Sequence, residues 1–282
     1  MTAERRPVAG STSRLAAATR RPQQLKAQRA TRTAAGELAL IGAGYLCYTL
    51  LRNAVPTHEP AARLRAGELL RWESAAHLDP ERTLNNALAG LRPLAVAADY
   101  YYATAHFLVV IAVAVWAARR APGAARRLRA VFYTHNAVGL AGFWLFPLAP
   151  PRLLTGYGFI DTVVAFHTWG SWGSTSVDAA SNQFAAMPSL HVGWALWCTL
   201  TVWTLTRHRL PRLLAAGYPV LTALVVLGTA NHYLLDVAGG ALALLLALAA
   251  TAVLPRRRRS AAGAHDRDTS RWLPRGAAGP AD

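Results

Sequence analysis

The chain has 282 residues, 53% of them hydrophobic, and a formal net charge of +16. Its apolar residues occur in long uncharged runs, which excludes a single water-soluble domain. The charge alone would suit a nucleic-acid-binding protein, but its position along the chain argues against one. Of the 30 Lys and Arg residues, 23 fall in four segments, at 1–35, 119–129, 207–212 and 256–282.

Six nearly uncharged runs alternate with these basic segments and with three longer or more polar connections. A membrane-spanning helix needs about 20 apolar residues at a rise of 1.5 Å each. We therefore expect an all-α polytopic membrane protein with a six-transmembrane-helix bundle in residues 37–254. The runs are Leu38–Leu51, Tyr100–Ala118, Ala130–Leu148, Pro188–Thr206, Leu213–Ala230 and Val237–Leu254.

The four basic segments lie on one side of a six-span arrangement, as in the positive-inside pattern. This pattern predicts that both termini are cytoplasmic and that the connections near 52–97, 150–187 and 231–236 face outward. The tails, 1–36 and 255–282, are basic and poor in apolar residues, so we expect them to be disordered. Anionic lipid headgroups suit such tails better than nucleic acid.

Between the first two runs, residues 61–78 have the periodicity of an interfacial helix. Its predicted apolar face carries Leu69, Trp72 and Ala76. The two cysteines, Cys47 and Cys198, lie inside apolar runs, so we predict that they are buried apolar side chains and not a disulfide.

The third run ends in Phe-Pro-Leu-Ala-Pro-Pro-Arg, from Phe146 to Arg152. Closely spaced prolines stop a helix and restrict the backbone, and they lead directly into an arginine at the outer side. Arginine binds phosphate through a rigid fork of donors, although a snorkelling role at the interface is also common. The connection 150–187 is long, which is typical of functional loops.

The fourth run begins at Pro188-Ser-Leu-His191. A helix N-terminus offers unpaired backbone N–H groups that suit phosphate, and Ser189 could add a hydroxyl donor. His191 would then be placed to protonate a leaving-group oxygen. The alternative is a helix-end histidine that is hydrogen-bonded to a loop.

His232 and Asp236 are spaced i, i+4, so on a helix they share one face. A carboxylate beside a histidine can accept its Nδ1–H and leave Nε2 available for nucleophilic attack. The alternative is an ordinary polar pair at a helix start. Ionisable groups within membrane segments are rare and more often functional, which favours the catalytic interpretation.

Weaker candidates surround these residues. Asp99, Asp161 and Asn231 lie near the outer face and could contact a headgroup. His106 and His135 lie inside spans, where we expect hydrogen bonds between helices. A metal site built from His191, His232 and Asp236 is conceivable, but no further carboxylate or thiolate supports it, so no metal and no cofactor are expected.

The three motifs together resemble the type 2 phosphatidic acid phosphatase superfamily. Pro188-Ser-Leu-His191 is similar to its second motif, and His232-x-x-x-Asp236 is similar to the end of its third. Together with the segment from Phe146 to Arg152, they look most like the inositol phosphorylceramide synthase branch and its bacterial relatives. The resemblance covers about residues 37–254.

The resemblance implies a six-helix core and a metal-independent phosphohistidine intermediate. Carried over, His232 would be the nucleophile, Asp236 its orienting acid and His191 the general acid, while Arg152 and Ser189 would bind phosphate. Two family cations are missing, because the first-motif lysine position is Leu145 and the third-motif arginine position is Val226.

The expected function is that of a membrane lipid phosphatase or phosphotransferase at the extracytoplasmic face. It would cleave a lipid phosphate or diphosphate ester, with water or an alcohol such as inositol as acceptor. Its expected partners are this substrate, a possible alcohol acceptor and membrane lipids, but not nucleic acid. The alternative is a non-catalytic membrane lipid-binding or transport protein that retains a phosphate site.

Overall fold

The computed structural model describes residues 35–55, 59–168 and 183–253. In these ranges the chain is helical, and its only extended pairing is an isolated bridge between Leu148 and Ala185. The predicted all-α class is therefore confirmed. The predicted disordered tails, 1–36 and 255–282, lie almost entirely outside the described residues, although the first helix already includes residues 35 and 36.

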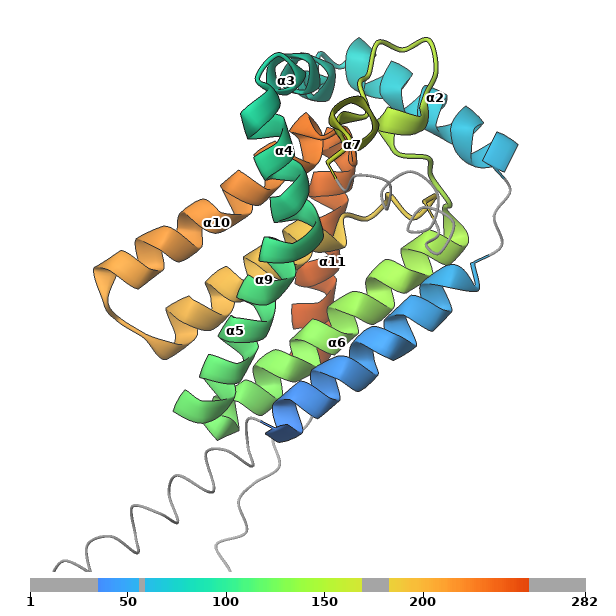
Figure 1. Ribbon diagram of the computed structural model, residues 1–282. Coiled ribbons are helices and arrows are strands. Elements are labelled where there is room, and N and C mark those ends of the chain that lie inside the picture. The colour runs from blue at the N-terminus through green and yellow to red at the C-terminus, as the bar shows by residue number, and fades with distance from the viewer. Residues whose placement is uncertain (1–34, 56–58, 169–182, 254–282) are drawn as a thin grey trace, which may run out of the picture.

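Long helices pack side by side into a bundle (Figure 1). The N-terminal helix, residues 35–53, lies along α6 at one edge, where Tyr133 donates to the backbone oxygen of Leu40 at 2.8 Å. The other long helices of the described chain are α4 (Arg92–Tyr100) continued by α5 (His106–Arg120), α6 (Pro122–Leu145), α9 (Leu190–Leu205), α10 (Arg209–Gly228) and α11 (Leu234–Ala252).

The remaining elements gather at one end of the bundle, at the top of Figure 1. They are α2 (Glu59–Ala75), α3 (Pro80–Ala89), α7 (Thr162–Phe166) and a 3₁₀ turn, Pro151–Leu153. Pro80 begins α3 because proline is tolerated in the first helical turn, where its missing N–H would have no partner. All three sequence motifs end at this pole of the bundle, so the fold brings them together.

Among the residues that the structure describes, three helices are long and apolar enough to cross a membrane: the continuous helix Arg92–Arg120, α10 and α11. The apolar helix α9 is shorter, with 16 residues. Exposed leucines such as Leu221 and Leu245 on α10 and α11 suit a hydrocarbon surrounding. These helices support a membrane protein, while the count of six spans stays a prediction.

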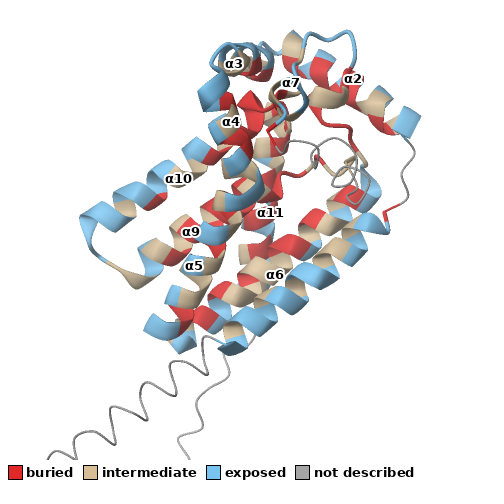
Figure 2. Ribbon diagram, viewed as in Figure 1, coloured by how far each residue is buried: buried red, intermediate tan, exposed pale blue. Residues whose placement is uncertain are grey.

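The core lies where α5, α6, α9 and α11 meet, and Figure 2 shows buried residues on their facing sides. Phe143, Trp194, Trp197 and Leu244 pack there. The indole N–H of Trp197 donates to the backbone oxygen of Leu128 at 2.7 Å, so this buried ring keeps its polar atom paired. Both tryptophans therefore pack between helices.

The helix predicted at 61–78 exists as α2, while its interfacial position stays a prediction. Of its predicted apolar face, Leu69 is buried with Ala62 and Trp72 is 69% exposed. The buried side faces the loop after α6, where the Ala149 N–H donates to the Ala62 oxygen. The prediction that both cysteines are buried is wrong for one of them. Cys47 is exposed because the N-terminal helix forms an edge of the bundle, whereas Cys198 is buried as predicted.

Candidate active site

The loop after α6 positions the first motif beside the second. The Leu148 N–H donates to the Phe184 oxygen at 2.8 Å, close to the start of α9. The Tyr233 hydroxyl donates to the Ala149 oxygen at 3.0 Å and ties the same loop to the third motif. Three segments that are distant in sequence therefore meet at one end of the bundle.

Arg152 is held by hydrogen bonds on every side of its guanidinium. Nε donates to Asn231 at 3.1 Å, Nη1 to Asp161 at 2.9 Å and Nη2 to Gln183 at 3.2 Å. Its backbone N–H donates to the oxygen of Ala230 at 2.9 Å. The side chain is only 16% exposed. A guanidinium fixed in this way has little rotamer freedom left to lose when it binds an anion.

Asp236 lies behind His232. The Asp236 carboxylate is fully buried and accepts from the Tyr233 N–H at 3.0 Å, which caps α11. The same oxygen lies 3.3 Å from Nδ1 of His232. With the proton on Nδ1, this pair leaves Nε2 as a free lone pair, and Nε2 has no hydrogen-bond partner among the described residues.

His191 lies in the first turn of α9 and faces His232. The two ring centroids are 6.1 Å apart. Tyr102 stacks on His191 at 4.2 Å with the planes only 20° apart, which fixes the ring orientation. Nε2 of His191 also lacks a hydrogen-bond partner in the described chain. Two imidazoles therefore present unpaired nitrogens in one place.

A cavity of about 370 Å³ contains both histidines. Arg152, Asn231 and Arg52 also line it, so cationic and hydrogen-bonding groups surround the two rings. The cavity is large enough for a phosphate group with part of its ester. This arrangement can hold an anion between a nucleophilic nitrogen and a second nitrogen that could carry a proton.

Two of the five predicted site residues do not line this cavity. Asp236 contacts Nδ1 of His232 at 3.3 Å, and its orienting role stays a prediction. Ser189 is fully buried and caps α9, because its hydroxyl oxygen accepts from the Val192 N–H at 3.5 Å. The phosphate-binding role of Ser189 stays a prediction, and its observed contact is structural.

The weaker sequence candidates divide into two groups. Asp161 and Asn231 line the cavity and hold Arg152. Asp99 also lines it and accepts from Thr162 and Thr168 at 2.6 and 2.7 Å, which anchors the segment around α7.

The prediction for the two histidines inside spans holds for one of them. His106 makes the predicted bond between helices, with Nδ1 2.7 Å from the Tyr218 hydroxyl of α10. His135 is fully buried where α6 faces Gly193, and neither of its ring nitrogens has a hydrogen-bond partner among the described residues, so the predicted bond is absent there.

Sequence reasoning missed Arg52 and Tyr102. Arg52 directly follows the first apolar run, Leu38–Leu51, so the sequence already places a cation at the end of that run. Tyr102 reaches His191 from a single π-helical turn, Tyr101–Ala105, between α4 and α5. Such turns are common at functional sites but leave no periodic pattern in a sequence.

A buried acidic pair lies beyond Asp236, on the outer side of the site. Glu73 accepts from the Leu235 N–H at 2.6 Å and so ties α2 to the start of α11. Glu81 of α3 is fully buried beside it. Burial raises the pKa of Glu73 to about 8, and the charges of Glu81 and Asp236 add to this rise. Burial likewise raises the pKa of Glu81.

The described ranges contain no group of three His, Cys, Asp or Glu side chains placed to hold a metal ion. What they contain is a pair of opposed imidazoles, a carboxylate behind one of them and a fixed arginine. This combination, at one pole of the helical bundle, has the kinds of side chain that bind and transfer anionic, phosphate-like groups.

A comparison with protein families identifies the class. The PAP2 superfamily matches residues 67–250, and the chain belongs to this superfamily. The match includes all three motifs and leaves out the N-terminal helix. Membership suggests phosphatase-type activity on lipids in a membrane. Neither the curated proteins nor the solved structures compared with the chain contain a match.

Proposed function

We propose that the protein is a multi-pass cell-membrane lipid phosphatase or phosphotransferase that works through a phosphohistidine. The observation that carries this proposal is the opposition of His232 and His191 across one cavity, with both Nε2 atoms unpaired in the described chain. A binding protein needs cations for phosphate, but it does not need two opposed imidazoles.

The first step transfers the phosphoryl group to the enzyme. Nε2 of His232 attacks phosphorus, the bond from phosphorus to the ester oxygen breaks, and that oxygen takes a proton from His191. Asp236 accepts the Nδ1–H of His232 and stabilises the positive charge that develops on the ring. Arg152 neutralises the phosphate oxygens.

The second step releases the phosphoryl group to an acceptor. His191, now neutral, takes a proton from water or an alcohol, and the acceptor oxygen attacks phosphorus as the bond to Nε2 breaks. Water gives inorganic phosphate, while an alcohol such as inositol gives a new phosphoester. The resemblance to the inositol phosphorylceramide synthase branch supports testing polyols as acceptors.

The charge pattern supports a location for this chemistry. Basic segments at both ends and in two connections favour cytoplasmic termini and an active site at the extracytoplasmic face. No step above requires a metal, so we propose activity in the presence of a chelator.

The test measures phosphate release from a panel of lipid phosphates and diphosphates in detergent with EDTA, with and without polyols. We expect His232→Ala to reduce turnover on the order of 10⁴-fold. We expect Asp236→Asn to reduce turnover about a thousandfold, because the asparagine cannot serve as the anionic acceptor of the Nδ1–H of His232. His208→Ala, at an exposed position before α10, is the matched control and should keep wild-type activity.

A radiolabelled donor quenched into alkali should leave label on the wild-type protein and none on His232→Ala. Equal turnover of His232→Ala and His208→Ala would reject the nucleophile. Lipid binding without any phosphate release or transfer by the wild type would favour the non-catalytic alternative.

A further inference from the structure

The N-terminal helix lies outside the region that the superfamily match covers, yet it forms part of the active-site cavity. Tyr45, Tyr48 and Arg52 from this helix line the cavity together with His191 and His232. The family resemblance therefore does not account for one wall of the site.

Arg52 brings a second guanidinium to the site. Its charge acts electrostatically on His191 and on Tyr102, and the charge of Arg152 acts on the same tyrosine. Leu145 and Val226, which occupy the positions of two superfamily cations, lie elsewhere, since Leu145 is 82% exposed and Val226 packs in an apolar cluster. Within the described chain, Arg52 and Arg152 are the arginines that line this cavity.

A second cavity of about 420 Å³ adjoins the active-site cavity on the side of the apolar part of the bundle. The two cavities share Tyr45, Tyr48, Ala103, Phe107 and Trp194 as lining residues. The walls of the second cavity are the N-terminal helix, the π-helical turn, α5, α6 and Trp194 of α9, and most of the lining side chains are hydrocarbon or aromatic. We call this space the apolar channel.

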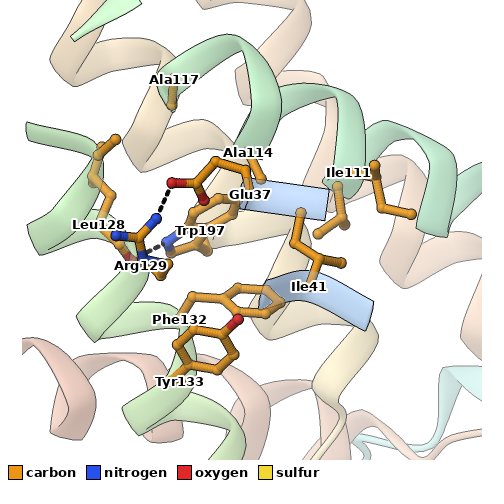
Figure 3. Close-up of a pocket in the computed structure, with 12 residues that line it drawn as sticks. Glu37, Ile41, Ile111, Ala114, Ala117, Leu128, Arg129, Phe132, Tyr133 and Trp197 are labelled. Carbon is orange, nitrogen blue, oxygen red and sulfur yellow. Dashed lines mark hydrogen bonds and ion pairs between the residues drawn. The ribbon is translucent and has the colours of Figure 1, made fainter. Parts of the chain in front are cut away.

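The apolar channel ends near an ion pair. A smaller cavity of about 40 Å³ shares Ile41, Ile111 and Phe132 with it (Figure 3). There the carboxylate of Glu37 faces the guanidinium of Arg129. The three adjoining cavities thus place cations at one end, an apolar region in the middle and an ion pair at the other end.

The length of the apolar channel fits one hydrocarbon chain of one membrane leaflet. Its wall on the N-terminal helix runs from Tyr48 to Leu38, and at 1.5 Å per residue these ten steps cover about 15 Å. Half of a hydrocarbon core of about 30 Å is also about 15 Å.

We propose that the N-terminal helix is the element that recognises the substrate lipid. Arg52 binds the phosphate together with Arg152, and the apolar channel holds one hydrocarbon chain of the same molecule. This inference rests on the proposed function and specifies its substrate as a phosphate lipid with at least one long, flexible hydrocarbon chain.

The test measures binding, so it does not depend on turnover. Hexadecylphosphonate, methylphosphonate and hexadecanol are titrated against the full-length His232→Ala protein in detergent. We expect hexadecylphosphonate to bind about a hundredfold more tightly than either of the other two, because it contacts both the cations and the channel.

Arg52→Gln should lower the affinity for both phosphonates by about tenfold to a hundredfold, and the affinity for hexadecanol should not change. Arg120→Gln, at the far end of α5, is the matched control. Equal phosphonate affinities in these two variants would overturn the role of Arg52.

Gly42→Leu tests the channel. Gly42 lines the apolar channel and has open space at its Cβ position. A leucine side chain there would fill part of the space proposed for the hydrocarbon chain of the lipid. We expect the preference for hexadecylphosphonate over methylphosphonate to fall about tenfold. Gly36→Leu, which also has open space, is the control on the same helix, and Ala103→Leu narrows the channel from another wall.

If Gly42→Leu and Ala103→Leu prefer hexadecylphosphonate over methylphosphonate as strongly as Gly36→Leu does, the channel assignment is overturned. If hexadecanol and hexadecylphosphonate bind equally tightly and lose affinity together, the channel holds a bulk membrane lipid and not the substrate. If the wild type binds as expected but neither releases nor transfers phosphate, the proposed function fails while the recognition site stands.

Discussion

At the residue scale, the two Nε2 atoms of His191 and His232 are the most telling feature. Each is buried without a hydrogen-bond partner among the described residues. A buried unpaired polar atom costs about 1–3 kcal/mol. His106 and His135 also have unpaired ring nitrogens, but only His191 and His232 among these four line the active-site cavity. A phosphate oxygen placed between the rings would contact both.

The i, i+4 spacing pointed to a contact between His232 and Asp236, and the two side chains do meet, with 3.3 Å between Nδ1 and the carboxylate. The contact does not form on one helix, however, because α11 begins at Leu234 and His232 precedes its N-cap, Tyr233. The approach of Arg52 to His191 could not be predicted, since the residues lie on separate helices and only the packing of those helices sets their distance.

Glu73 should make stability fall as pH rises. Its pKa is about 8 in the folded protein against 4.5 for the free side chain. The folded state therefore binds the extra proton, and the stabilisation is complete below about pH 4.5 and lost as pH rises to about 8. Thermal unfolding in detergent across this range should show a loss of up to a few kcal/mol.

Glu73→Gln is the informative variant, because its amide oxygen can still accept from the Leu235 N–H. It should flatten the pH dependence. The other titratable groups that act on Glu73 are Glu81 and Asp236, and Asp79 acts on Glu81. A wild type that gains stability between pH 5 and 8 relative to this variant would contradict the assignment.

At the element scale, the helix boundaries follow from local chemistry, while the π-helical turn does not. Ser189 caps α9 and Pro122 begins α6, and both signals are visible in the sequence. The turn Tyr101–Ala105 lies within an uninterrupted helical run, so the sequence alone predicted an ordinary span there. Its position beside His191 is decided by packing between helices.

Gly240 sets how closely α11 approaches the start of α9. A Cβ atom at this position would lie 2.2 Å from the backbone oxygen of Ser189, which cannot move away as a side chain could. Gly240→Ala should therefore lower the unfolding free energy by about 1–3 kcal/mol and reduce turnover, because it displaces the helix that carries Asp236.

Gly217→Ala is the control for that variant. It lies in α10 with open space around it, so alanine should stabilise the helix by about 1 kcal/mol. Thermal unfolding in detergent and phosphate release measure both effects. Similar stability of the two variants would show that α11 can shift without cost.

At the scale of the whole molecule, the composition was enough to predict a helical membrane protein. It was not enough to establish the number of membrane-spanning helices. Apolar runs predicted the helices because burial in a bilayer demands uncharged sequence. The helix α6 starts with Pro-Gly-Ala-Ala-Arg-Arg and carries Asn136, so a part of its length is polar. The shared cavity between the N-terminal helix and α5 depends on long-range packing, which a linear pattern does not contain.

The orientation in the membrane can be tested with single cysteines in a chain without Cys47 and Cys198. Thr155→Cys, exposed at the pole of the site, should react with a membrane-impermeant maleimide in intact cells. His208→Cys, exposed in the connection between α9 and α10, should react only after lysis. The reverse pattern would place the site in the cytoplasm.

Ala230 gives the oxygen that fixes the Arg152 backbone, and its own backbone is left-handed, with φ of 51°. This conformation costs an alanine about 1–2 kcal/mol. The residue is fully buried, so neighbouring groups, and not its own preference, impose the shape. The turn that joins the arginine to the histidine thus stores conformational strain, and the protein gives up part of its stability to keep the two groups in register.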